Sequence, residues 1–297
     1  MKGIFLFISL FIYISSLSQT ECIQAIDENN TTVPYVTMIV KMRNSVFTGD
    51  SLGKVCLTSD LFIKNGDTIF ISAIGYENLN EVYTGKKVFI LKRKNILLPE
   101  VVIVNGEGIL ETWGTKKNDG SAGGFRCRQV FHQATYSLAR IIYPDADVKK
   151  AEIRSIAFHD ETGRGIDVPV RLRIFLIGKD SLPLNDYLQE NIFLGTKGKG
   201  WIEADLEGKG LIVPKEGIAI GIELFANSDE YFYTEKIKNR NGKKRENKLY
   251  GFSLARESDD GFLTLMKFNT WRSWVVERFD HHNCGNLVCR VKVKVWR

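Results

Sequence analysis

Three side chains that suit sugar binding alternate along one short stretch of the chain. Residues 201–206 read WIEADL, and since successive residues of a strand point to opposite faces, Trp201, Glu203 and Asp205 share one face. Such a face exposes an aromatic ring beside two carboxylates, which suits stacking on a sugar ring and hydrogen bonding to its hydroxyls. We predict a ligand-binding surface here; the competing interpretation is that Trp201 packs in or over the core, as tryptophan commonly does.

A second aromatic pair stands in a segment that we expect to form a loop. Trp271, Arg272 and Trp274 lie within the four residues WRSW. Two indole rings beside a guanidinium group suit the same class of ligand, a glycan. The predicted ligand-binding residues are therefore Trp201, Glu203, Asp205, Trp271, Arg272 and Trp274.

The sequence contains no motif that assigns a catalytic role. Residues Gly49-Asp50-Ser51-Leu52-Gly53 have the Gly-x-Ser-x-Gly spacing but stand where we expect a turn between strands, and there is no Walker loop and no His-Glu-x-x-His zinc signature. The carboxylates of Glu203 and Asp205 cannot be assigned to catalysis without a distance in the fold. We therefore predict no catalytic residue, no cofactor-binding residue and no cofactor. A hydrolase of envelope or extracellular polysaccharide, with its site in the C-terminal domain, is the alternative.

The four histidines lack the spacing of a metal site. His281 and His282 are adjacent, ahead of Cys284 and Cys289, and adjacent residues of a strand point to opposite faces. We expect an exposed turn there and predict no metal ligand. The stretch 159–163, His-Asp-Glu-Thr-Gly, is expected to form a solvated turn after a strand.

Positive charge gathers in one part of the sequence. The formal net charge is +6, and +5 without Lys2, an excess too small to indicate nucleic-acid binding. Seven basic residues surround the turn Asn241-Gly242, opposed only by Glu235 and Glu246: Lys236, Lys238, Arg240, Lys243, Lys244, Arg245 and Lys248. Two interpretations stay open: a solvated hairpin loop, or a contact with an anionic partner such as a phosphorylated glycan or a lipid head group.

The N-terminus has the pattern of a secretory signal peptide. Lys2 precedes an apolar run from Ile4 to Ile14, and Ser16-Leu17-Ser18 forms a small-x-small cleavage site. We predict a signal peptide over residues 1–18 and a mature chain from Gln19, with lipidation at Cys22 as the alternative. No later stretch is long and apolar enough for a transmembrane helix, so we expect an exported protein of the periplasm or outer-membrane surface.

The cysteines do not form the dense framework of a small disulfide-rich domain. Five are spread over the chain, at 22, 56, 127, 284 and 289. A local disulfide between Cys284 and Cys289 is one option for that pair. Cys56, inside KVCLT, is expected to be a small buried apolar residue.

The strand pattern predicts two β-sandwich domains. In residues 19–104 short apolar segments recur every eight to twelve residues between turn signals, which favours about seven strands; the segment from Thr68 is expected to be a central strand buried on both faces. Residues 105–124 include six glycines and are predicted to be a linker. Residues 125–297 again alternate in the β manner, most clearly at 169–176, where Arg171 and Arg173 share one face.

The first domain resembles a known family. The succession PYVTMIV, KVCLT, DTIFISAIGYE, KVFILK and LPEVVIV, within about residues 21–104, is similar to the carboxypeptidase-regulatory-like domain of exported Bacteroidota proteins. Val55 stands where that family usually has an aromatic residue, and the first strand lacks the customary glycine. The resemblance implies a transthyretin-like β-sandwich without peptidase chemistry, of the kind often placed before outer-membrane receptors or surface proteins.

The second domain resembles the β-sandwich that often follows this regulatory-like domain in Bacteroidota proteins. The segments that carry this resemblance are RLRIF, PLNDYL, WIEADL and VPKEGIAIGIEL. We therefore predict an all-β chain with a transthyretin-like sandwich followed by a larger jelly-roll-like sandwich. Its expected role is a non-catalytic binding or assembly module of the cell envelope, whose partner is a glycan or an envelope protein rather than nucleic acid.

Overall fold

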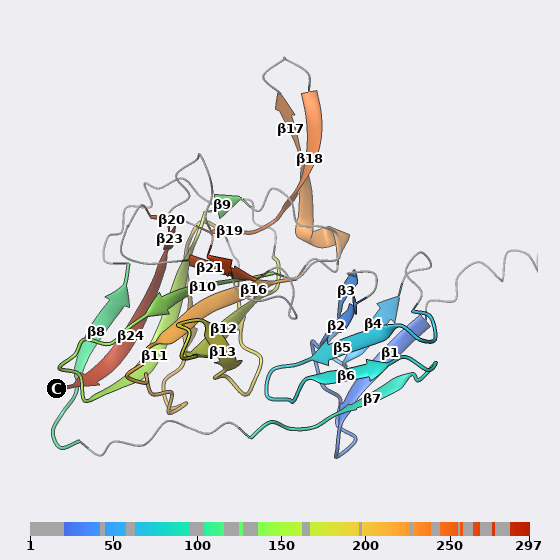
Figure 1. Ribbon diagram of the computed structural model, residues 1–297. Helices are drawn as coiled ribbons and strands as arrows, with labels where there is room; N and C mark the ends of the chain where they lie inside the picture. The colour runs from blue at the N-terminus through green and yellow to red at the C-terminus, as the bar shows by residue number, and fades with distance from the viewer. Residues whose placement is uncertain are drawn as a thin grey trace, which may run out of the picture. The chain divides into compact units, whose positions relative to one another are not determined.

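The fold consists of β-strands joined by turns and loops (Figure 1). A computed structural model describes residues 21–41, 45–57, 63–95, 104–115, 125–126, 136–161, 167–195, 198–225, 228–238, 244–254, 256–257, 264–267, 275–276 and 286–297. The predicted all-β class and β-sandwich architecture are confirmed. The chain forms two compact units, Met1–Lys94 and Asn95–Arg297, and each is described here by itself.

The first unit is a sandwich of a three-stranded and a four-stranded sheet, in the orders β4-β1-β7 and β3-β2-β5-β6. Its strands are β1 (Glu21–Asp27), β2 (Thr37–Val40), β3 (Ser45–Thr48), β4 (Lys54–Leu57), β5 (Thr68–Ser72), β6 (Leu79–Val82) and β7 (Val88–Leu91). One apolar cluster, which includes Met38, Ile69 and Phe89, fills the space between the sheets. β5 lies between β2 and β6, but only Ile69 and Ile71 are buried on it, so the prediction of a strand buried on both faces is wrong.

A disulfide joins two neighbouring strands of the first unit. Cys22 on β1 lies directly opposite Cys56 on β4, and the two residues are 34 positions apart in the chain. Both cysteines are exposed. The expectation that Cys56 is a buried apolar residue is therefore wrong, because its side chain points away from the core, towards its partner across the strand pair.

The second unit contains two large sheets (Figure 1). The first, here the β11 sheet, consists of β8 (Ile109–Gly114), β24 (Cys289–Trp296), β11 (Lys150–Asp160) and β15 (Gly200–Asp205), extended by β19 (Ser253–Leu254) and β9 (Phe125–Arg126). The second, here the β16 sheet, consists of β13 (Pro183–Asp186), β12 (Val170–Ile177), β16 (Ile218–Leu224), β10 (Tyr136–Ile142), β21 (Thr264–Lys267) and β22 (Val275–Val276), with β14 (Phe193–Leu194) also on β12.

Two small strand pairs complete the second unit. β17 (Phe232–Lys238) and β18 (Lys244–Tyr250) form a hairpin after a 3-10 turn at Asp229–Tyr231, and β20 (Arg256–Glu257) pairs with β23 (Asn286–Leu287). The predicted hairpin in the basic segment is thus confirmed, although its tip, residues 239–243, lies outside the described residues.

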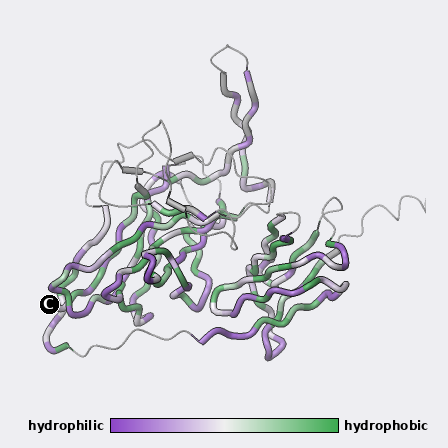
Figure 2. Tube along the Cα trace, in the orientation of Figure 1, coloured by the Kyte–Doolittle hydropathy of each residue, from purple (hydrophilic) through white to green (hydrophobic). Residues whose placement is uncertain are grey.

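Apolar residues on alternate positions build the core of the second unit, and the alternation is visible along its strands in Figure 2. On the β11 sheet the buried set includes Ile153, Phe158 and Val293. Arg140 of β10 is fully buried, and its Nη1 donates to the Thr115 hydroxyl and to the Leu287 carbonyl, both at 3.0 Å. This side chain ties the β16 sheet to residues at the end of β8 and beside β24.

The structure corrects the predicted linker. Within residues 105–124, the segment Ile109–Gly114 forms strand β8, which pairs with β24 over six residues. Strand β8 therefore belongs to the second unit, and the division between the units falls at Lys94 rather than at residue 104. The predicted closing strand of the first domain, residues 98–104, lies almost entirely outside the described residues.

The second face of the β16 sheet buries a charged cluster. Arg171 on β12 lies opposite Glu223 on β16, and the two side chains are 2% and 1% exposed. Arg173 contacts the same Glu223 carboxylate and binds Asp186 through two hydrogen bonds of 2.8 and 2.6 Å. Asn191 accepts a further hydrogen bond from Arg171 at 2.8 Å. The predicted shared face of the two arginines is observed, and Arg171 and Glu223 on it are almost completely shielded from water.

Candidate functional site

The outer face of the β11 sheet is the candidate functional surface. Along β24 the sequence CRVKVKVW alternates strictly, so Cys289 and the three valines are buried while the residues between them point outwards. The outward set is Arg290, Lys292, Lys294 and Trp296. This central strand therefore presents a row of cations that ends at an indole ring.

Strand register places the predicted residues of β15 beside this row. Trp201, Glu203 and Asp205 lie opposite His159, Ala157 and Ser155 of β11, which in turn lie beside β24. The pairing of β11 with β24 shifts its register between Ile153 and Ser155, as at a β-bulge, and both Arg154 and Ser155 line the outer face. The predicted sharing of one face by Trp201, Glu203 and Asp205 is observed, since the intervening Ile202 and Ala204 are buried.

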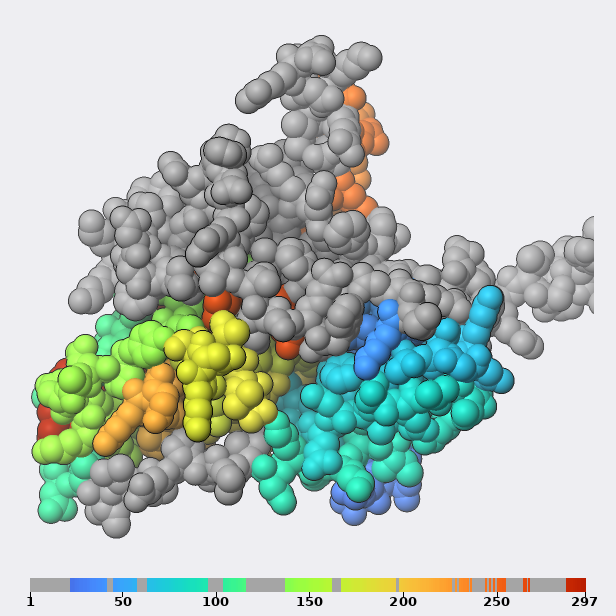
Figure 3. Space-filling model, viewed as in Figure 1, coloured from blue at the N-terminus to red at the C-terminus, as the bar shows by residue number. Residues whose placement is uncertain are grey.

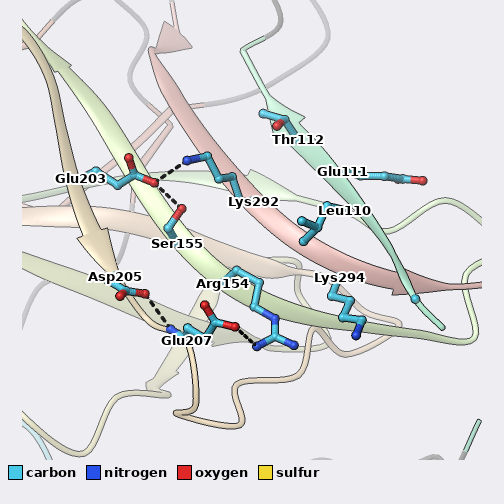
Figure 4. A pocket seen from close by; sticks show the side chains of 11 residues that line it. Leu110, Glu111, Thr112, Arg154, Ser155, Glu203, Asp205, Glu207, Lys292 and Lys294 are labelled. Carbon is cyan, nitrogen blue, oxygen red and sulfur yellow. Dashed lines mark hydrogen bonds and ion pairs between the residues drawn. The ribbon is translucent and has the colours of Figure 1, made fainter.

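A groove of about 810 Å³, here the outer-face groove, runs over these strands (Figure 4). Leu110 and Thr112 of β8 line one side, Lys292 and Lys294 of β24 lie between, and Glu203 and Asp205 of β15 line the other side. Leu110 is 70% exposed and adds an apolar surface to a groove whose other side chains are polar.

Two internal ion pairs hold the polar side chains of the groove in place. The Glu203 carboxylate accepts hydrogen bonds from the Ser155 hydroxyl at 2.5 Å and from Lys292 Nζ at 2.9 Å. The Ser155 bond first, and the Lys292 bond second, lower the pKa of Glu203 below its ordinary value. Arg154 donates to Glu207 at 2.9 Å on the same side (Figure 4).

Two charged groups of the groove keep their ligand-binding capacity. Lys294 has no ion-pair partner in the described part of the chain; its ammonium lies 5.4 Å from the centre of the Trp296 ring. Asp205 accepts the backbone N–H of Glu207 at 3.0 Å and has no cationic partner among the described side chains. A donor and an acceptor are thus available to a molecule in the groove.

Trp201 is fixed by its neighbours and only partly exposed. The guanidinium carbon of Arg290 lies 4.2 Å from the centre of the indole ring, and the His159 ring packs at right angles to it at 5.2 Å. Arg290 is itself held by the Thr115 carbonyl at 3.2 Å. The sequence predicted an exposed ring; the structure shows a partly covered one, so Trp201 presents less of its surface than predicted.

The position of His159 also differs from the prediction. His159 and Asp160 are the last residues of β11, Asp160 is buried, and Glu161 Oε1 lies 3.0 Å from Nδ1 of His159. The predicted solvated turn at 159–163 is therefore wrong for His159 and Asp160, which belong to the strand, while residues 162 and 163 lie outside the described residues. Pairing with β15 continues the strand to Asp160 and brings the imidazole onto Trp201.

The second indole of this face stands at the far end of the cation row. Trp296 donates its Nε1 hydrogen to the Gly106 carbonyl at 3.1 Å, and Lys150 Nζ lies 4.9 Å from its ring centre. A Cβ added to Gly108 would lie 2.7 Å from Cε2 of this ring, so only glycine lets the chain before β8 lie against the indole.

Sequence reasoning found part of this surface. It missed Ser155, Lys292, Lys294 and Trp296, although the alternation of β24 is a signal that could have identified the last three. Trp271, Arg272 and Trp274 lie outside the described residues, so their role stays a prediction, as does the disulfide option for Cys284 and Cys289.

In the described ranges, no three His, Cys, Asp or Glu side chains gather as a metal site. No helix in that part of the chain is long and apolar enough to cross a membrane.

Comparisons with known proteins give little further information. No protein-family model matches the chain, and no curated protein matches it either. One solved structure that is similar at low level comprises the cysteine protease and lectin-like domains of Cwp84, a surface layer associated protein of Clostridium difficile. The identity is 12% and the TM-score 0.38, over 93% of this chain and 63% of that one, a likeness too weak to support a conclusion on fold or function.

Proposed function

We propose that this protein is an exported, non-catalytic module of the cell envelope that binds a glycan in the outer-face groove. The observation that carries the proposal is the convergence of hydrogen-bonding groups on one face of the β11 sheet. Lys294 offers a donor, Asp205 an acceptor, and Leu110 an apolar contact within the same groove. A sugar presents the matching set, hydroxyl groups around an apolar ring face.

The charge balance of the groove favours an uncharged glycan. Lys292 is paired with Glu203, and Arg154 with Glu207, so each of these cations already has a carboxylate within 2.9 Å. The remaining pair, Lys294 and Asp205, is of opposite sign. A ligand with many hydroxyl groups can accept from one and donate to the other without separating an existing ion pair.

The state of Glu203 argues against a role as the general acid of a hydrolase. A general acid of a glycoside hydrolase needs a raised pKa so that it is protonated at the working pH. The pKa of Glu203 is lowered instead. A hydrolase with its site elsewhere in the second unit remains the second candidate, and incubation with the bound polysaccharide would reveal it through new reducing ends.

The disulfide of the first unit supports export. Disulfides persist in oxidising compartments such as the periplasm and the cell surface, and are rare in the cytosol. Cys22 is bonded to Cys56 and so has no thiol for a lipid, which favours a mature chain that is not lipidated. The resemblance of residues 21–104 to a carboxypeptidase-regulatory-like domain points to the same location, with an envelope protein as the other candidate partner.

A glycan-binding screen with matched variants tests this proposal. The chain from residue 19 to 297 is applied to an array of neutral and acidic envelope polysaccharides, beside the double variant Asp205→Asn/Lys294→Gln. Asn at 205 keeps an oxygen that can accept the Glu207 N–H, so the fold is retained. We expect the double variant to lose about tenfold or more in affinity for a glycan that the native protein binds.

The control removes the same charges at a distance from the groove. Asp180 accepts the N–H of Leu182 as Asp205 accepts that of Glu207, and Lys215 is an exposed lysine. The variant Asp180→Asn/Lys215→Gln should bind the glycan as the native protein does. Absence of binding to any glycan would refute the function, whereas binding lost only in Trp271→Ala/Trp274→Ala would move the site away from the groove.

A further inference from the structure

The hairpin of β17 and β18 forms a ribbon separate from the two large sheets. The strands pair through seven residues and have no strand neighbour other than one another among the described residues. Figure 1 shows the ribbon, in orange, extending beyond the strands of the second unit, and atoms of the ribbon are seen in orange in Figure 3. Its base is anchored by aromatic contacts, with the rings of Phe232 and Tyr231 at 5.3 and 6.4 Å from that of the buried Tyr250.

One face of this ribbon is strongly cationic. The register sets Lys248 opposite Thr234, Lys236 opposite Glu246, and Lys244 opposite Lys238. Paired residues share a face, so the exposed Lys236, Lys244 and Lys248 lie on the same side as Glu246. The ion pair between Lys236 and Glu246 spans 3.4 Å with side chains 68% and 64% exposed, which makes it weak.

Folding does not explain this arrangement. Like charges directly opposite one another destabilise a strand pair, and a two-stranded ribbon has little buried apolar surface to offset that cost. Lys244 and Lys248 are exposed and contribute no side chain to the core of the second unit. The accumulation of lysines is thus a feature that a ligand, rather than the fold, accounts for.

We propose that the lysine face of the β17–β18 ribbon binds a linear polyanion, an acidic polysaccharide that carries carboxylate, sulfate or phosphate groups. Lys244 and Lys248 are four residues apart on β18, a separation of about 13 Å, and Lys236 lies on β17 opposite Glu246 between them, so the three lysines form a row along the ribbon that matches charges repeated along a polymer. Lysine carries a flexible point charge and lacks the planar guanidinium with which arginine binds one carboxylate through two hydrogen bonds. A row of lysines therefore suits a ligand with repeated anionic groups better than a ligand with a single carboxylate.

The surroundings of the lysines favour a polymer over a membrane. Stable attachment to a bilayer combines basic residues with apolar side chains that enter the lipid. No described side chain of the ribbon is an exposed large apolar residue. The lysine face of the ribbon is therefore an anion-binding surface, distinct from the outer-face groove, in which Lys292 and Arg154 already have carboxylate partners.

Binding to dextran sulfate, with neutral dextran as the reference, tests the proposal. The protein from residue 19 to 297 should bind dextran sulfate with an affinity that falls steeply as salt rises, and should not bind neutral dextran through the ribbon. The variant Lys236→Gln/Lys244→Gln/Lys248→Gln should lose about tenfold or more in affinity and show a shallower salt dependence. Glutamine keeps much of the aliphatic stem, including that of Lys248 over Phe232.

Two controls separate the ribbon from net charge and from the groove. Lys54→Gln/Lys64→Gln/Lys92→Gln removes the same charge from exposed positions of the first unit and should bind dextran sulfate as the native protein does. The groove variant Asp205→Asn/Lys294→Gln should also retain this binding, so that failure of the groove function and failure of the ribbon function are distinguishable. Equal affinity of the native protein and the ribbon variant would overturn the proposal, as would ribbon-dependent binding to anionic phospholipid vesicles without binding to dextran sulfate.

Discussion

Two strands of the second unit have almost the same residue pattern and opposite surroundings. β24 reads CRVKVKVW and β12 reads VRLRIFLI, so in both strands cations alternate with apolar residues. On β24 the cations line the outer-face groove, where the Lys292 side chain is 59% exposed; on β12 the Arg171 side chain is 2% exposed. Alternation therefore predicts which side of a strand is polar, but not whether that side meets water.

The neighbouring strand accounts for the difference. β16 reads IAIGIEL, and its one charged residue, Glu223, lies opposite Arg171. The ring centres of Phe225 and Phe175 each lie 4.9 Å from a guanidinium carbon of the cluster, which removes water from it. In the groove, the Glu203 partner of Lys292 is 43% exposed. The same kind of ion pair thus stabilises the fold from a buried position on the β16 sheet, whereas on the β11 sheet it is exposed to water and can rearrange.

Removing the buried carboxylate gives the largest expected effect. In Glu223→Gln, Arg171 and Arg173 would remain buried without the charge that both contact. Breaking a buried pair in this way costs about 3–5 kcal/mol of the free energy of unfolding. Urea denaturation followed by tryptophan fluorescence measures this loss of unfolding free energy. The signal reports on the second unit alone, because all five tryptophans follow residue 94.

The matched substitution in the groove is Glu203→Gln, which should lower the free energy of unfolding by no more than about 1 kcal/mol. Comparable losses in the two variants would show that burial does not separate the two clusters, and the comparison between the sheets would fail.

Acid stability should depend on the same buried carboxylate. Burial alone would raise the pKa of Glu223, but the charges and hydrogen bonds of Arg171 and Arg173 outweigh it and lower the pKa from 4.5 to about 2. A lowered carboxyl pKa stabilises the folded state above the unfolded value and loses that contribution as the pH falls from 4.5 towards 2.

Urea denaturation at several pH values across this window provides the measurement. The native protein should lose stability more steeply than Glu223→Gln, because the variant lacks this titrating group, while the other carboxylates titrate in both. Parallel pH profiles of the two proteins would indicate that Glu223 does not carry the acid-sensitive part of the stability.

Local patterns in the sequence predicted much of the fold. The period of two placed Trp201, Glu203 and Asp205 on one side of β15, with Ile202 and Ala204 buried on the other, and the turn Asn241-Gly242 marked a hairpin. These features depend on residues close in sequence. The all-β class follows from many such segments together.

Features that depend on distant residues could not be predicted in the same way. Cys56 reads as an apolar strand residue until its pairing with β1 places it opposite Cys22. β8 lies in a glycine-rich stretch that becomes a strand because β24, about 180 residues later, supplies its partner. His159 is in a strand because β15 pairs with it. Pairing with a strand distant in sequence, rather than local propensity, determined the structure at these three positions. The same long-range pairing places the strands that line the groove side by side.

The smallest expected effect is the coupling free energy between Lys292 and Glu203. This pair is the exposed counterpart of the buried pair Arg171 and Glu223. A double-mutant cycle of Lys292→Gln and Glu203→Gln should give a coupling free energy of about 0.2–1 kcal/mol, since both side chains keep contact with water. Added salt should reduce that coupling, because exposed charges are screened.

The stability lost in Glu223→Gln should change much less with salt, because its partners are buried. A coupling in the groove of several kcal/mol that resists salt would mean that the outer-face groove is a rigid structural cluster, and that Lys292 and Glu203 are not available to rearrange around a ligand.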